Sequence, residues 1–323
     1  MRIYLFITIM AATISFGFNQ ISFAGCNENP ANTFTCTDDP PNPDLVGIQQ
    51  DTNNNSLTMD LLPGSIINTT AASTIAIDVG NGNNQLTMNH AQVITLADDN
   101  GIEFGNGSNI LEINDSEVRC EEDCLDMGNG SDNINIVRSI IESLDNNGID
   151  ANAGNDVITV IDSQVLAGPQ CCNNFGITLG DGDDQLTVIN SRVAGFTMNQ
   201  PIPSAITMQS GNNTVRLGTG AQIDGLISCN DSTDFDTLIF AMEVPDSQLE
   251  TISNQLATKN PDGDSIAING LFYEWENCDN IVNELVGGFI SPVPTLSQWG
   301  LIAMAGILGI VGFMVMRRRS FMV

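Results

Sequence analysis

Basic residues are scarce in this sequence. It contains 9 Lys and Arg, 39 Asp and Glu, and a single His. Four of the basic residues stand close to the two ends, at Arg2 and at Arg317, Arg318 and Arg319, so only five lie among the acidic residues. Such a surface repels nucleic acid and anionic lipid and attracts cations. A nucleic-acid partner is therefore excluded, and a polysaccharide lyase would find few Arg or Lys side chains to serve as its base.

Aromatic residues are also rare, at 6% of the sequence. A carbohydrate-binding module needs exposed rings on which sugars can stack. The central part of the chain offers three candidates, Phe104, Phe175 and Phe196, and we expect Phe104 to point inward. This scarcity counts against a sugar-binding platform on the face of the body.

The eight cysteines contain no pair of CxxC motifs, so a zinc site is not expected. An even number of cysteines in an exported chain favours disulfides instead. We predict two pairs, Cys26–Cys36 and Cys229–Cys278.

Apolar segments near both ends predict export and anchoring. Arg2, the apolar run that follows it and the small residues before Ala24 are typical of a signal peptide over residues 1–24, read by the Sec export machinery. A lipoprotein signal is the alternative, because Cys26 follows small residues. Residues 300–316 form an uncharged apolar run followed by three arginines, which predicts a transmembrane helix with its basic end in the cytoplasm.

A repeat of about two dozen residues runs through the body of the chain. Each copy has two apolar residues two positions apart, a glycine turn, an Asp or Asn, two more apolar residues, and then a small and a β-branched residue. Clear copies begin at Ala76, Gly101, Cys124, Gly148, Gly176 and Ala205, and weaker ones at Gly47 and Asp234.

Apolar residues at period two indicate short strands with one buried face, and such units become stable only when they stack. We therefore predict an all-β fold, a right-handed parallel β-helix of about eight rungs over residues 47–240. Its connections are longest at 167–174 and 195–204. These loops lie on one edge, where a surface glycan or a ligand on a host or neighbouring cell would bind.

Both ends of such a rod need covering, because open sheet edges aggregate. Residues 25–46 are expected to form an N-terminal loop or cap. Residues 241–288 are expected to form a small α+β cap with a helix from Asp246 or Ser247, a hairpin at Asn269-Gly270 and a short helix over 280–285.

One copy of the repeat, Gly180-Asp181-Gly182-Asp183-Asp184, resembles the core of the calcium-binding nonapeptide repeat. Asp132, Asp156 and Asp184 take the same position in three consecutive copies, and Asp183 adds charge. Carboxylates about 5 Å apart repel one another, and Ca²⁺ would relieve that repulsion. Equally, these side chains could cap turns as Asn does in the other copies. Both interpretations stay open at this point.

The tail combines a short motif, the apolar run and the basic end. The motif is Val293-Pro294-Thr295-Leu296-Ser297-Gln298-Trp299-Gly300, and the basic end is Arg317, Arg318 and Arg319. Residues 289–323 therefore resemble the IPTL-CTERM sorting domain, with Val293 in place of Ile. The resemblance implies recognition by an exosortase-type membrane protease and transfer of the body to the outer surface of a Gram-negative bacterium.

These features predict an exported, envelope-anchored, non-catalytic protein, a stalk or adhesin-like rod. Two alternatives stand beside it. One is a β-helical lyase or hydrolase acting on polysaccharides, for which carboxylate pairs are available but a basic catalytic residue is not evident. The other is a calcium-stabilised carbohydrate-binding module.

Overall fold

The computed structural model describes the repeat body and its C-terminal cap. The described residues are 26–29, 33–36, 48–49, 58–61, 66–69, 75–95, 99–169, 173–197, 203–229 and 234–288. The expected signal peptide, the sorting segment with its transmembrane helix, and Cys171 and Cys172 lie outside them.

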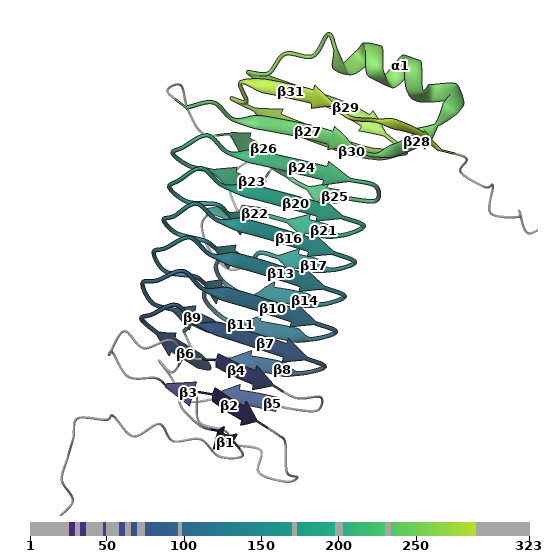
Figure 1. The fold of residues 1–323 in the computed structure, drawn as a ribbon. Helices are drawn as coiled ribbons and strands as arrows, with labels where there is room; N and C mark the ends of the chain where they lie inside the picture. Colours follow the sequence, from purple (N-terminus) through teal and green to yellow (C-terminus); the bar gives the residue numbers. More distant parts are fainter. Residues whose placement is uncertain are drawn as a thin grey trace, which may run out of the picture.

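The body is a β-solenoid of about six turns, built from three sheets (Figure 1). Each of six consecutive turns gives one strand to every sheet. These turns are β6–β8, β9–β11, β12–β14, β15–β17, β19–β21 and β23–β25.

Sheet 1 faces the viewer in Figure 1. In spatial order it consists of β1 (Cys26–Asn29), β2 (Thr33–Cys36), β4 (Thr58–Leu61), β7 (Gln85–Asn89), β10 (Ile110–Asn114), β13 (Asn133–Val137), β16 (Val157–Ile161), β20 (Gln185–Ile189), β24 (Thr214–Gly218), β27 (Thr237–Ala241) and β31 (Asn280–Asn283). All its pairs are parallel except β1 with β2.

Sheets 2 and 3 complete the three-sided section. Sheet 2 consists of β5 (Ile66–Thr69), β8 (Gln92–Thr95), β11 (Glu117–Cys120), β14 (Ile140–Ser143), β17 (Gln164–Leu166), β21 (Arg192–Ala194) and β25 (Gln222–Asp224). Sheet 3 consists of β3 (Ile48–Gln49), β6 (Ile77–Gly80), β9 (Ile102–Phe104), β12 (Leu125–Asp126), β15 (Ile149–Asp150), β19 (Ile177–Thr178), β23 (Ser204–Met208), β26 (Leu226–Cys229), β30 (Leu271–Glu276) and β29 (Gly263–Ile268).

Two short pairs stand apart from these sheets. β18 (Asn173–Asn174) pairs antiparallel with β22 (Phe196–Thr197) at the edge where the long connections lie. β28 (Glu243–Pro245) pairs in parallel with β32 (Val286–Gly288) beside the helix.

The core is made of inward side chains that stack in register from turn to turn. The columns predicted from the repeat are present and buried to within 1% exposure: Ile102, Leu125, Ile149, Ile177 and Ile206 in sheet 3, and Leu111, Ile134, Ile158, Leu186 and Val215 in sheet 1. Phe104 also points inward and is 1% exposed. Because every strand alternates buried and outward positions, its register is fixed by burial.

The expected eight rungs become about six turns. At the N-terminal end β3, β4 and β5 still join the three sheets, but the residues between them lie outside the described part of the chain. At the other end the copy from Asp234 supplies only β27, and the chain then leaves the repeat for the cap.

The cap continues the solenoid sheets instead of forming a separate layer. β30 pairs in parallel with β26, and β31 pairs in parallel with β27. The hairpin β29–β30 and helix α1 (Asp246–Leu256) lie where the sequence predicted them. The prediction of a helix over 280–285 was wrong, because residues 280–283 form β31 at the edge of sheet 1.

The aromatic side chains of the cap seal this end of the core. Tyr273 and Trp275 are each 1% exposed, and both rings meet Phe240 edge-on. The Tyr273 hydroxyl donates to the carbonyl of Ala221 at 2.6 Å, which ties the cap to the last turn. Phe272 is 59% exposed, because it takes the outward position of β30.

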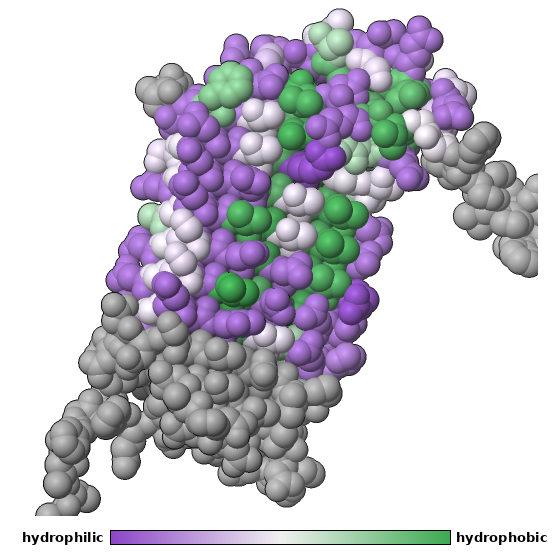
Figure 2. Space-filling model, viewed as in Figure 1, coloured by the Kyte–Doolittle hydropathy of each residue, from purple (hydrophilic) through white to green (hydrophobic). Residues whose placement is uncertain are grey.

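The outward face of sheet 1 carries small groups of adjoining apolar side chains among polar ones (Figure 2), such as the register partners Val137, Ile161 and Ile189. Ile110 is 41% and Val157 is 40% exposed, both at the first position of their strands. Single exposed apolar residues of this kind are usual on folded proteins.

Replacing Ile158 with Ala should lower the free energy of unfolding by about 2–5 kcal/mol, because a buried side chain is lost from a tightly packed column. Val157→Ala on the same strand is the matched control and should change it by about 0.5 kcal/mol or less. Urea denaturation followed by circular dichroism measures both. Equal losses for the two variants would contradict the inward column.

Candidate functional site

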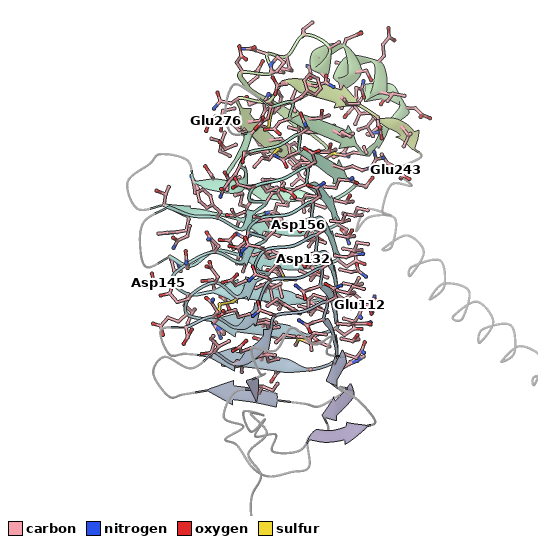
Figure 3. The ribbon with its side chains drawn as sticks, turned by 60° about the vertical axis from the view of Figure 1, so that its left-hand side comes forward. Glu112, Asp132, Asp145, Asp156, Glu243 and Glu276 are labelled. Atoms are coloured by element: carbon pink, nitrogen blue, oxygen red, sulfur yellow. A yellow bond between two sulfur atoms is a disulfide. The ribbon has the colours of Figure 1, made fainter. Side chains whose placement is uncertain are left out.

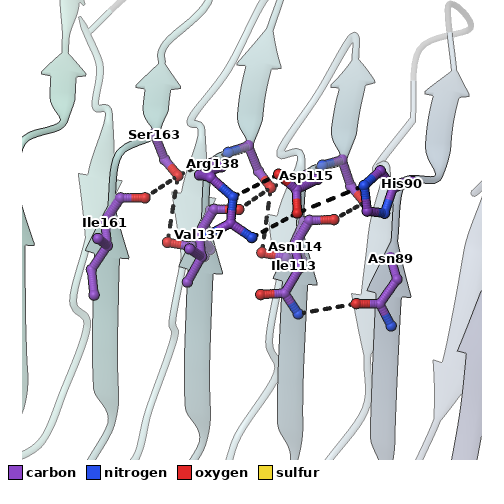
Figure 4. Close-up of polar contacts among 12 residues, drawn as sticks. Asn89, His90, Ile113, Asn114, Asp115, Val137, Arg138, Ile161 and Ser163 are labelled. Carbon is purple, nitrogen blue, oxygen red and sulfur yellow. Dashed lines mark hydrogen bonds and ion pairs between the residues drawn. The ribbon is translucent and has the colours of Figure 1, made fainter. Parts of the chain in front are cut away.

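The corners between the sheets carry two columns of polar side chains that hold neighbouring turns together. The first column lies between sheets 1 and 2 and consists of Ser116, Ser139, Ser163 and Ser191, each at most 6% exposed. Each Oγ accepts the backbone N–H of the equivalent residue one turn earlier, at 2.9–3.0 Å. The same hydroxyl donates to the carbonyl two residues before it, at 2.7–2.8 Å (Figure 4). Every serine of this column thus accepts one hydrogen bond and donates another.

The second column lies at the turns between sheets 3 and 1. It consists of Asn84, Asn109, Asp132, Asp156, Asp184, Asn213 and Asp236, all at most 2% exposed. In each step a side-chain oxygen accepts the backbone N–H of the column residue one turn earlier, at 2.6–3.1 Å. We call this set the Asn/Asp column. It supplies acceptors to buried amides that would otherwise be unpaired.

Glycines allow the turns of this column to stack in contact. Gly154 has a φ of +157°, and a Cβ there would lie 1.6 Å from the Gly130 carbonyl oxygen. A Cβ at Gly130 would lie 1.8 Å from the Gly107 carbonyl oxygen. The glycine turn of the repeat is therefore required by close approach of one turn to the next.

The three central aspartates differ from their asparagine neighbours in one atom. Asn84, Asn109 and Asn213 use Nδ2 to donate to the carbonyl two residues earlier, at 3.1–3.2 Å. In Asp132, Asp156 and Asp184 the corresponding Oδ2 is buried and has no hydrogen-bond partner among the described residues. Asp132 and Asp156 lie one above the other in the middle of the rod (Figure 3). Burial raises the pKa of Asp132 and Asp184 to about 7 and that of Asp156 to about 6.

The calcium interpretation of Asp132, Asp156, Asp183 and Asp184 stays a prediction, and the structure shows how these carboxylates are bonded. In the part of the chain that the structure describes, no group of three or more His, Cys, Asp or Glu side chains could hold a metal ion. The three buried carboxylates each give one oxygen to a backbone amide, and Asp183 turns outward to accept from Asn212. The turn interpretation describes this geometry better, because one residue per turn fills a fixed place in a ladder.

An acidic stripe follows the outward face of sheet 3. Asp78, Glu103, Asp126 and Asp150 are partners on four successive strands. Burial raises the pKa values of Asp78, Glu103 and Asp150, and the neighbouring carboxylates of the stripe raise those of Glu103 and Asp150 further. The stripe makes this face strongly negative and unsuited to polyanions.

A polar hollow of about 260 Å³ lies at the end of the acidic stripe. It is lined by Asn129, Asp150, Asn152, Ala153, Gly180, Asp181 and Gln209. In this hollow, a glycosidase would have to use the carboxylates of Asp150 and Asp181 as its acid and its base. Asp181 is engaged by the hydroxyl of Ser210, and Asp150 accepts the backbone N–H of Asn152.

The five basic residues of the body are all bound to carboxylates. Arg119 pairs with Glu142, Arg138 with Asp115, Arg192 with Asp224, Arg216 with Glu284 and Lys259 with Asp264. His90 lies 3.9 Å from Asp115 in an exposed corner, next to the two-pronged contact of Arg138 with the same carboxylate (Figure 4). The pairs of Arg119, Arg138 and Arg192 link neighbouring turns. All five pairs occupy the side chains that a lyase would need as its base.

Two disulfides are present among the described residues. Cys229–Cys278 is the pairing expected from the sequence, and it joins the last turn to the cap. Cys120–Cys124 was not predicted. It spans the corner between β11 and β12, and its signal was that Cys124 occupies a repeat start where other copies have Ala or Gly. Cys26 lies opposite Cys36 in the β1–β2 pair, so the third pairing stays a prediction.

Comparison with known proteins identifies the tail. Residues 291–319 match the model of the IPTL-CTERM motif, so the chain carries this sorting motif at its C-terminus. The motif implies an exported, cell-envelope-associated protein that is processed by an exosortase-type sorting system. No curated protein and no solved structure matches the chain. Within the described residues no helix is long and apolar enough to cross a membrane, and the apolar run 300–316 lies outside them.

Ser163→Ala should lower the free energy of unfolding by about 1–3 kcal/mol, because the buried amide of Ser139 would lose its acceptor. Gln164→Ala is the control, since it removes an exposed side chain at the next position. Denaturant titration of both variants checks the difference. A Ser163→Ala protein as stable as the Gln164→Ala protein would contradict the role of the serine column.

Proposed function

We propose that this protein is a non-catalytic surface rod, a stalk or adhesin-like protein, presented by a C-terminal sorting signal. The observation that carries the proposal is the match of residues 291–319 to the IPTL-CTERM motif. A signal peptide over 1–24 would direct the chain to the Sec machinery, and the motif would pass it to an exosortase-type protease. The body would then reach the outer surface of a Gram-negative cell.

The properties of the body support a structural role. About six turns at roughly 4.8 Å per strand give a solenoid about 30 Å long, held by continuous sheets and two polar columns. Its outer face is acidic, which keeps it soluble and prevents contact with anionic polymers.

The ligand of an adhesin-like rod would bind at the edge of the long connections, where β18 and β22 form an added pair. The longest connections between turns lie at this edge. A surface glycan or a ligand on a neighbouring cell is the partner we propose for it.

The engaged basic residues support a non-catalytic body. A polysaccharide lyase needs a free base near the sugar, and all five basic side chains of the body form ion pairs. The hollow at Asp150 and Asp181 offers carboxylates without an Arg, Lys or His in its lining. At this hollow the hydrolase alternative would depend on Asp150 and Asp181.

Replacing Pro294 and Trp299 together with Ala should block processing, because both residues belong to the matched motif. In a Gram-negative host with an exosortase-type system, we expect the unaltered chain to be shortened and accessible to protease on intact cells. The variant should stay full-length and inaccessible. Ser320→Ala, just outside the match, is the control and should behave as the unaltered chain. Normal shortening and surface exposure of the double variant would refute the sorting role.

Purified protein incubated with neutral and acidic polysaccharides should release no new reducing ends and no unsaturated products. Asp150→Asn with Asp181→Asn is the control that assigns any activity to the hollow. Product formation that this double variant abolishes would establish the hydrolase alternative. Sorting and catalysis are tested separately, so one result does not depend on the other.

A further inference from the structure

A position in the two polar columns has two hydrogen bonds to make. It accepts the backbone N–H of the neighbouring turn, and it donates a hydrogen to the carbonyl two residues earlier in its own turn. Serine does both with a hydroxyl, as Ser163 does with Ser139 and Ile161. Asparagine does both with its amide, as Asn109 does with Asn84 and Gly107.

An ionised aspartate can make only the first of these two hydrogen bonds. Oδ1 of Asp132, Asp156 and Asp184 accepts the neighbouring N–H at 2.6–2.7 Å. Oδ2 then occupies the place of the asparagine Nδ2 but has no hydrogen to give, and it is buried without a partner among the described residues. The carbonyls at the equivalent place are those of Gly130, Gly154 and Gly182. A buried acceptor that faces another acceptor is strongly unfavourable.

A proton on Oδ2 restores the missing hydrogen-bond donor and requires no additional space in the core. We propose that Asp132, Asp156 and Asp184 are held as neutral carboxylic acids, each donating its proton to the carbonyl two residues earlier, and that together they make the middle of the solenoid sensitive to pH. The protonated acid then has the hydrogen-bonding pattern of asparagine, which explains why both residue types occur in one column.

The charged groups that face this column are acidic and favour the neutral form. Asp132 and Asp184 both face Asp156, and Asp184 also faces Asp181 and Asp183. Asn109 and Asn213 close the run of three at its two ends. Beyond Asn213 the next member, Asp236, faces the carboxylates of Asp234 and Asp279. The five basic side chains of the body pair with other carboxylates.

The direction of the pH dependence follows from the pKa values. Burial raises the pKa of Asp132 and Asp184 to about 7 and that of Asp156 to about 6, above the value of about 3.9 for an unfolded chain. Between about pH 4 and pH 7 the folded state therefore binds more protons than the unfolded state. The stabilisation is fully present below about pH 4 and is lost as the pH rises through 6 to 7.

The test compares the full chain in detergent with the variant Asp132→Asn, Asp156→Asn and Asp184→Asn. The urea midpoint of the unaltered chain should fall between pH 5 and pH 8, and each carboxyl should change the unfolding constant by up to about tenfold per pH unit below its folded pKa. The triple variant should show a clearly smaller fall and a higher midpoint at pH 8, because only other buried carboxyls such as Asp123 and Asp150, whose pKa values burial also raises, still release protons. An equal fall in both proteins would overturn the proposal.

A matched control separates the column from general charge repulsion. Glu243→Gln, Glu250→Gln and Asp262→Asn remove the same number of charges from exposed positions. This control should follow the unaltered chain. A control that loses the pH dependence as completely as the column variant would assign the effect to net charge and overturn the proposal.

Two direct measurements complete the test even if the triple variant does not fold. In the unaltered chain with ¹³Cγ-labelled aspartate, the signals of Asp132, Asp156 and Asp184 should titrate near pH 6–7, beside that of Asp123, whose pKa burial also raises to about 7. Titration of the three column residues below pH 5 would refute neutral acids. Millimolar Ca²⁺ at pH 8, against EDTA, should leave the midpoint of the unaltered chain unchanged. A calcium-dependent rise would show that a cation, and not a proton, satisfies Oδ2.

Discussion

The structure depends on one constraint, which is that the buried backbone amides at the corners must find acceptors, many of them in a neighbouring turn. Along the strands the parallel sheets satisfy it. At the corners the strands stop, and the amides of Ser139 or Asp132 would be buried and unpaired. A small polar side chain from the following turn solves this, and the repeat places one at each of two corners. The short repeat, its glycine turns and its polar columns are consequences of this single requirement.

The same constraint limits which residues the corners accept. A side chain there must both accept and donate, must be short, and must lie beside a glycine turn that permits close stacking. Ser and Asn meet these conditions as neutral groups. Asp meets them only in its protonated form, which links a detail of corner geometry to the pH at which the rod is most stable.

Charged side chains on the outer surface have a different role from the buried aspartates. Basic side chains are few, and each of the five in the body pairs with one carboxylate. The remaining carboxylates form stripes such as Asp78 to Asp150, which keep the rod soluble and separate it from other anionic surfaces. A long, acidic, internally bonded body joined to a sorting motif fits a displayed structural element.

The sequence by itself determined the strands, their inward columns and the sorting motif, because period-two burial and a short linear motif are local signals. Ile102 and Leu111 could be assigned to their columns from spacing alone. The number of complete turns, the Cys120–Cys124 bond, the strand at 280–283 and the exposed Phe272 were decided by the tertiary structure. The aspartate column shows the difference most clearly. Its spacing in the sequence fits a metal ladder or a turn ladder equally, and only the stacked turns reveal that one oxygen of each carboxyl is already bonded and the other is buried against its own backbone.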